Sequence, residues 1–148
     1  MSLVIDATVE IDAPAELVWQ VITDFPRYGE WNPFCVEASS TLVPGEPIDM
    51  LVKTSGSSTR RQREWIRSHT PGTEFSYSMK PTPVGALHSL RSHKVTALTP
   101  DRTRYESHFE LAGWLQPVVA ALLGKNLKNG FAGMTEGIQK QAESLRAN

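Results

Sequence analysis

The chain has 148 residues, with 15 Lys and Arg against 16 Asp and Glu, and 40% of its residues are hydrophobic. This length suits a single core and this composition excludes a mainly disordered chain, so we expect one domain over residues 1–148. The net charge of −1 leaves no general attraction for nucleic acid or for an anionic membrane surface. No apolar run is long enough to span a bilayer, and the lone Cys35 and the lack of an export signal predict a cytoplasmic protein without disulfides.

The first part of the chain predicts a strand followed by two short helices. Residues 3 to 11 alternate between apolar and polar side chains, which is typical of a half-buried strand. Asp12 and Pro14 then provide the capping side chain and the first-turn proline of a helix. The apolar residues of this helix recur three and four positions apart: Leu17, Val18, Val21, Ile22 and Phe25. Proline and glycine break residues 25–33 into a turn or a second short helix.

From Phe34 to Leu111 the chain predicts six strands joined by short turns. The turn signals are Pro44-Gly45, Gly56 to Ser58, Pro71-Gly72, Pro81 to Gly85 and Pro100-Asp101. Between them, three sets of side chains alternate along one face: Ile48, Met50 and Val52; Phe75, Tyr77 and Met79; and Tyr105, Ser107, Phe109 and Leu111. This close spacing indicates antiparallel strands rather than parallel strands with crossover helices.

The last part of the chain predicts one long helix from Gln116 to Arg146. A break in this helix is expected near Gly124. Its apolar residues fall on one stripe: Leu123, Leu127, Phe131, Met134, Ile138, Ala142 and Leu145. The stripe must cover a partner, and the sheet is the only large one. The predicted fold is therefore α+β, a sheet wrapped around a C-terminal helix.

Sequence motifs towards both ends of the chain are similar to those of a known superfamily. Residues 11–19 read IDAPAELVW, residues 23–28 read TDFPRY and residues 31–34 read WNPF. Residues 103–105 read TRY and residues 113–115 read GWL, just before the long helix. Together these segments resemble START-like proteins of the polyketide cyclase/dehydrase type, in the Bet v 1-like (SRPBCC) superfamily.

The resemblance implies a helix-grip fold, in which a curved seven-stranded antiparallel sheet grips the long C-terminal helix and encloses a cavity. Members bind apolar or amphipathic small molecules, and a minority catalyse reactions in the cavity. Several relatives carry an acidic residue or a histidine on the inner face of the last strand. This chain has Tyr105, Ser107, Phe109 and Leu111 there, which argues against a carboxylate in that role.

The cavity would be lined by large apolar side chains with a few polar groups, the usual composition of a small-ligand site. The candidates are Trp31, Phe34, Met50, Val52, Phe75, Tyr77, Met79, His93, Tyr105, Ser107, Phe109, Leu127, Phe131 and Met134. Tyr28, Trp31 and residues 81–85 fall where connections at the mouth would lie. The alternative is that the same side chains fill an ordinary core.

A glycine stripe, Gly130, Gly133 and Gly137, flanks the apolar face of the long helix. Each glycine costs about 1 kcal/mol relative to alanine inside a helix, so the stripe needs a compensating role. Either the helix packs closely against the sheet edge, or the missing side chains leave room for a ligand.

His93 is the best candidate for proton transfer, since it shares strand parity with Val95 and histidine titrates near neutral pH. No motif pairs it with a second acid or base, so the catalytic residues stay unknown, and a lone inward histidine is more often a hydrogen-bonded core residue. No spacing of His and Cys suits a metal, and no phosphate-binding or serine-nucleophile motif occurs, so no metal or cofactor is predicted. Cys35 is predicted to be a half-buried structural thiol.

Alternation places Arg61, Arg63, Trp65 and Arg67 on one strand face, beside Arg60. Such a basic stripe suits either a nucleic-acid or anionic-ligand surface or the solvated outer face of a strand. The near-neutral net charge favours the solvated face, and we expect no nucleic-acid partner.

The predicted function is binding of a hydrophobic or amphipathic small molecule, such as a lipid, quinone, polyketide or aromatic, in a cavity between the sheet and the C-terminal helix. The expected partner is this ligand alone, with no integral membrane segment and a monomeric or homodimeric chain. The alternative is a polyketide cyclase/dehydratase-like enzyme that acts on a ligand in the same cavity, and whether the chain is an enzyme stays open.

Overall fold

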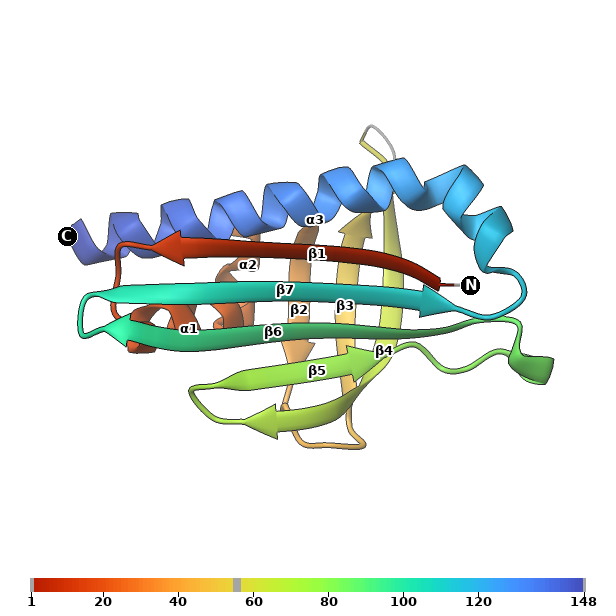
Figure 1. Cartoon of the computed structure of the whole chain (residues 1–148), viewed down its shortest axis with the longest axis horizontal. Helices are drawn as coiled ribbons and strands as arrows, with labels where there is room; N and C mark the ends of the chain where they lie inside the picture. Colours follow the sequence, from red (N-terminus) through yellow and green to blue (C-terminus); the bar gives the residue numbers. More distant parts are fainter. Residues whose placement is uncertain (1, 55–56, 148) are drawn as a thin grey trace.

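The computed structural model describes residues 2–54 and 57–147 and contains a seven-stranded antiparallel sheet that curves beside a long helix (Figure 1). The strands are β1 (Ser2–Ile11), β2 (Cys35–Ser40), β3 (Pro47–Lys53), β4 (Thr59–Thr70), β5 (Glu74–Ser78), β6 (His88–Thr99) and β7 (Arg102–Ala112). Their order in the sheet is β1-β7-β6-β5-β4-β3-β2. Strands β2 to β7 therefore form the predicted meander, and β1 is added beside the last strand. The predicted α+β helix-grip fold is confirmed.

The helical segments are α1 (Ala15–Thr23), η1 (Phe25–Arg27), α2 (Tyr28–Trp31), η2 (Pro83–Gly85) and α3 (Gln116–Ala147). The two short α-helices between β1 and β2 were predicted. Figure 1 shows α3 running along β1, with α1 and α2 gathered near its C-terminal half. The break expected near Gly124 is wrong, because α3 continues without interruption to Ala147.

Strand β1 shows how the sequence pattern sets the sheet. Its burial alternates along the whole strand, with the apolar side chains of the predicted face turned inward. It pairs with β7 residue by residue, from Ser2 opposite Ala112 to Ile11 opposite Thr103. β1 is an edge strand, and α3 lies against it, so the apolar face of this edge is covered rather than exposed.

The predicted helix cap at Asp12 is wrong, because α1 begins at Ala15 and its N-terminus has no side-chain cap. The Asp12 carboxylate instead pairs with Arg102 at 2.6 Å. Its backbone N–H donates to Glu143 at 3.0 Å and its carbonyl accepts from Arg146 at 2.9 Å. The backbone of Asp12 thus holds the end of α3 against the turn after β1, and its carboxylate is engaged by Arg102 instead of capping α1.

The packed core occupies only one end of the sheet's inner face. Its fully buried side chains come from α1, the sheet and the C-terminal half of α3, and include Ile22, Phe75, Tyr105, Ile138 and Ala142. By contrast, no residue between positions 117 and 130 of α3 is buried. The first half of α3 therefore covers a part of the sheet that the core does not fill.

The glycine stripe lets α3 approach the segment between α2 and β2. A Cβ at Gly137 would lie 2.7 Å from the Trp31 carbonyl oxygen, and one at Gly133 would lie 3.2 Å from the Pro33 ring. A Cβ at Gly130 would collide with the Phe34 ring. Close packing therefore accounts for the stripe, but its partner is residues 31–34 rather than the sheet edge.

This packing predicts opposite effects for two alanine substitutions in α3. Gly137→Ala should lower the free energy of unfolding by about 1–3 kcal/mol, because the new methyl group meets a backbone oxygen. Gly124→Ala is the matched control, since its Cβ would meet only the Ala120 methyl at 4.0 Å. It should raise stability by about 0.5–1 kcal/mol through helix propensity. Urea unfolding followed by circular dichroism measures both, and equal stabilisation by the two would contradict the packing.

Candidate functional site

A pocket of about 560 Å³ lies between the inner face of the sheet and the first half of α3. This volume is within the range of small-molecule sites. Its apolar wall comes from the sheet, from segments beside the strands and from α3, and includes Phe34, Met50, Val52, Tyr77, Met79, Leu87, Phe109, Leu111, Val119, Leu123, Leu127 and Phe131. The buried polar members of the wall are Glu64 and Arg91.

The structure divides the predicted cavity residues into two groups. Those on the pocket wall are Phe34, Met50, Val52, Tyr77, Met79, Phe109, Leu127 and Phe131. The others, outside the lining of this pocket, are Trp31, Phe75, His93, Tyr105, Ser107 and Met134. The second group lies towards the packed end of the molecule, where α1 and the C-terminal half of α3 fill the space under the sheet. Strand parity identifies the inner face but does not show where along that face the core ends.

The expected mouth residues are also divided. Tyr28 is buried, and its hydroxyl donates to the Ile22 carbonyl, so placing it at the mouth is wrong. The Trp31 ring packs edge-on against Tyr28, with 5.1 Å between the ring centroids. The loop at residues 81–85 is flanked by Lys80 and Leu87, which both line the pocket.

Phe34 is held in place by a turn encoded in the WNPF segment. The Asn32 side-chain oxygen accepts hydrogen bonds from the backbone N–H groups of Phe34 and Cys35, both at 2.9 Å. An asparagine that bonds the backbone two residues on is a common turn device. The Phe34 ring then contacts Phe131 at 5.1 Å, and Phe131 contacts Phe109 at 4.9 Å between centroids. On the pocket wall, these three rings link the segment just before β2 to α3 and β7.

Arg91 is a wall residue that the sequence reasoning missed. It is 2% exposed, and its guanidinium carbon lies 4.4 Å from the centre of the Phe131 ring. The residue stands on β6 directly opposite Tyr77 of β5 and Phe109 of β7. It lies two positions before His93 on the same strand. Residues two positions apart share a strand face, so the prediction that His93 points inward implied the same for Arg91.

Glu64 is the second missed residue. Its side chain is 7% exposed and accepts a hydrogen bond from the Gln62 amide. Burial raises the pKa of the Glu64 carboxyl, while the Gln62 hydrogen bond and the charge of Arg91 oppose the rise. The assignment of Arg61, Arg63, Trp65 and Arg67 to the outer face already implied that Gln62 and Glu64 point inward.

His93 has the surroundings of a core residue. It is fully buried, its ring stacks on Phe75 at 4.7 Å, and its Nδ1 lies 2.6 Å from the Tyr105 hydroxyl. Burial, and then the nearby charge of Arg91, hold the pKa of His93 well below its ordinary value. The imidazole is therefore neutral near pH 7 and poorly suited to donate a proton.

Cys35 is buried rather than half-buried, with its thiol donating to the Glu37 carbonyl at 3.3 Å. Burial raises the pKa of the thiol to about 12, so the reactive thiolate is scarce at neutral pH. Within residues 2–54 and 57–147, no group of three or more His, Cys, Asp or Glu is placed to hold a metal ion. No helix in the same ranges is long and apolar enough to cross a membrane.

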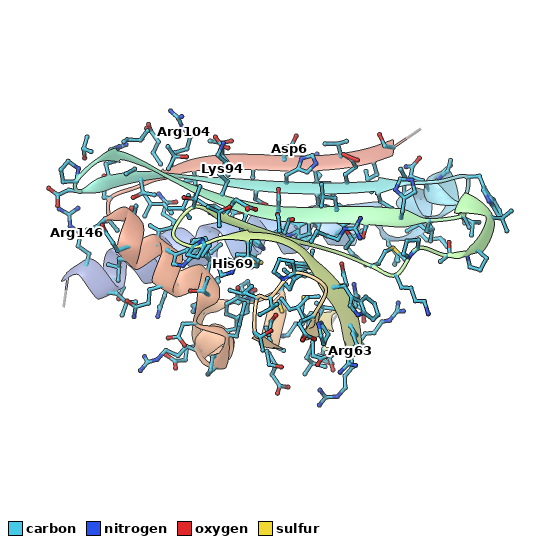
Figure 2. The ribbon with its side chains drawn as sticks, turned by 90° about the horizontal axis from the view of Figure 1, so that it is seen from below. Asp6, Arg63, His69, Lys94, Arg104 and Arg146 are labelled. Atoms are coloured by element: carbon cyan, nitrogen blue, oxygen red, sulfur yellow. The ribbon has the colours of Figure 1, made fainter. Side chains whose placement is uncertain are left out.

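The arginine stripe lies on the outer face of β4. Arg61, Arg63 and Arg67 are exposed, and Trp65 is partly buried between them in sequence. Arg63 pairs with Asp49 of β3 at 2.6 Å, and Figure 2 shows its side chain projecting away from the body of the molecule. The stripe thus has the geometry of a solvated strand face.

Comparisons with known proteins agree with this fold. The family described as polyketide cyclase / dehydrase and lipid transport matches residues 2–146. The ribosome association toxin RatA of Pseudomonas aeruginosa is 25% identical over 146 residues, which cover 98% of this chain and 99% of that protein. An aromatase/cyclase from Streptomyces sp. R1128 superposes with a TM-score of 0.74 at 17% identity, over 97% of this chain and 94% of the other. A START superfamily protein from Mycobacterium smegmatis gives 0.71 at 18% identity, over 96% and 98%. The predicted superfamily is confirmed.

Glu64 predicts a pH dependence of stability. Its pKa is raised on folding, so between its ordinary pKa of 4.5 and the folded pKa the folded chain holds a proton that the unfolded chain has lost. The free energy of unfolding contributed by Glu64 therefore falls as pH rises through this window. Glu64→Gln removes the titration, so wild type should lose stability relative to this variant from pH 4.5 upwards in urea unfolding.

Glu136→Gln is the control for this experiment. The pKa of the exposed Glu136 is lowered by its hydrogen bond and ion pair with Lys140, so its contribution has the opposite sign. Stability curves of wild type and Glu64→Gln that stay parallel from pH 4 to 8 would contradict the buried position of Glu64.

Proposed function

The chain belongs to the family described as polyketide cyclase / dehydrase and lipid transport, and we propose that it binds a hydrophobic or amphipathic small molecule in the pocket beneath α3. The observation that carries the proposal is the pocket of about 560 Å³ with a mainly apolar wall. Apolar walls with a few placed polar groups are what small-molecule sites provide. The ligand could be a lipid, a quinone, a polyketide or another aromatic compound.

The two halves of α3 support a route for ligand entry. The C-terminal half is anchored by the buried side chains of Met134, Ile138 and Ala142. The first half has no buried residue between positions 117 and 130, and the Asn126 amide donates to the carbonyl of Thr54, just after β3, at 3.2 Å. A segment with few buried contacts opens at low free-energy cost. The first half of α3 therefore acts as the movable wall of the pocket.

Filling the pocket should block binding. Leu127→Trp places a larger side chain on the wall and should weaken binding of the neutral dye N-phenyl-1-naphthylamine by about tenfold or more, a loss of about 1.4 kcal/mol. Leu122→Trp is the matched control on the same helix, since Leu122 is 74% exposed and outside the pocket lining. Equilibrium dialysis measures both, and native mass spectrometry of gently purified protein identifies any small molecule that is retained. Dye binding that Leu127→Trp leaves unchanged would contradict this pocket as the site.

A cyclase/dehydratase-like reaction in the same pocket is the enzymatic alternative. It requires an acid or base beside the ligand, and Glu64 meets this requirement better than His93, because Glu64 lines the pocket and burial raises the pKa of its carboxyl. No second titratable group forms a hydrogen bond with Glu64 in the described ranges. Binding without reaction is therefore the simpler proposal, and catalysis stays a prediction.

Ribosome association is a candidate of a different class, because the match to RatA runs the whole length of both proteins. A ribosome would need an exposed, basic surface of the protein to bind to. The arginine stripe on β4 is the candidate for such a surface. The ion pair of Arg63 with Asp49 and the net charge of −1 favour the pocket proposal, so we expect the chain not to sediment with bacterial ribosomes at 0.1 M salt. Sedimentation that is lost in the double variant Arg61→Glu/Arg67→Glu, but kept in Leu127→Trp, would instead establish this role.

A further inference from the structure

Arg91 carries a positive charge that forms no ion pair with any described residue of the protein. The residue is 2% exposed and stands on the pocket wall. In the described part of the chain, no Asp or Glu oxygen lies within 4.0 Å of an Arg91 nitrogen, the limit for an ion pair. A buried charge without a partner is costly, so its presence at a pocket calls for an explanation.

The hydrogen bonds of Arg91 are also incomplete. One terminal nitrogen donates to the Ser107 hydroxyl and, at 3.5 Å, to the His108 carbonyl. The other reaches only the Met134 sulfur at 3.6 Å, a weak acceptor. The buried Nε has no partner among the described residues. A guanidinium offers five N–H donors, so this one keeps unused capacity for an oxygen acceptor.

The charged groups that face the pocket are strongly unbalanced. The basic ones are Lys53, Arg60 and Lys80, all exposed and so at its rim, together with the buried Arg91. The only acidic one on the described wall is Glu64. The chain as a whole has a net charge of −1, so this excess of positive charge belongs to the pocket. A wall of this kind favours a negative ligand.

We propose that the ligand is a long-chain amphiphile with a carboxylate, and that Arg91 binds this carboxylate inside the pocket while the apolar tail extends along the wall towards the rim. The inference rests on the proposed function, since it names the ligand class of the same site. The planar guanidinium matches a carboxylate in shape and charge, forming two parallel hydrogen bonds. A single buried cation balances one negative charge, which favours a carboxylate over a phosphate dianion.

The wall beside Arg91 suits the rest of such a molecule. Met50, Met79 and Leu127 provide flexible apolar surface, and methionine adapts to chains of different shape. The rim cations attract the carboxylate before entry and are exposed to solvent, where single charges contribute little binding energy. Discrimination between a carboxylate and a neutral headgroup therefore depends on Arg91 rather than on the rim.

Displacement of N-phenyl-1-naphthylamine at pH 8 by dodecanoate and by dodecan-1-ol tests the assignment. Wild type should bind dodecanoate at least about tenfold more tightly than the alcohol. Arg91→Met should remove this preference but still bind the alcohol. Arg91→Lys should retain part of the preference for dodecanoate. Arg104→Met is the control, since Figure 2 shows Arg104 on the side of the sheet away from α1 and α3. Urea unfolding of each variant checks that it is folded.

The possible outcomes separate this inference from the proposed function. If wild type binds dye, alcohol and dodecanoate without preference, or if Arg91→Met keeps the preference, the role of Arg91 is wrong and the pocket proposal stands. If Arg60→Met and not Arg91→Met removes the preference, the headgroup lies at the rim and the inference is overturned. A stronger Arg91-dependent preference for dodecyl phosphate would overturn the carboxylate. If wild type binds none of these probes, both proposals fail.

Discussion

The close approach of α3 to residues 31–34 is the constraint on which the rest of the structure depends. Gly130, Gly133 and Gly137 lie where any side chain would meet Phe34, Pro33 or Trp31. This contact fixes the helix over the packed end of the sheet, where Ile138 and Ala142 are fully buried. The first half of α3 is not seated in this way, since no residue between positions 117 and 130 is buried. The space that remains there is the pocket, so the same contact that stabilises the fold also makes the site.

The fold was predictable from the sequence because it depends on repeated patterns. The alternation in β1 and the three- and four-residue spacing in α3 each involve many residues, so single exceptions do not change the result. The local errors have local causes. Asp12 was expected to cap α1, but Arg102 is 90 residues away in sequence and its competition is invisible before folding. Gly124 was expected to break α3, but one glycine costs too little to interrupt a helix packed along its length.

The candidate site was predictable only in part, for a related reason. Parity assigns each strand residue to a face, and the face was correct for Met50, Tyr77 and Phe109. Whether an inward-facing residue lies in the packed core or on the pocket wall depends on where α1 and α3 pack against the sheet. No pattern within a single strand shows this. The same parity places Glu64 and Arg91 on the inner face, but the expectation of an apolar cavity drew attention to histidine and aromatic residues instead. Charged residues at inward positions deserve as much weight as apolar ones, because burial makes each of them costly.

Sheet register explains why Arg91 cannot relieve its own burial. Tyr77 and Phe109 stand directly opposite it on the two neighbouring strands, and Phe131 of α3 packs over its guanidinium. A long side chain at the end of a strand can reach solvent, but one in the centre of a seven-stranded sheet is enclosed on both sides. The charge therefore remains in the pocket whether or not a ligand is present. An oxygen acceptor that enters the pocket would satisfy donors that the folded chain leaves unused, so ligand binding and stability are coupled through this one residue.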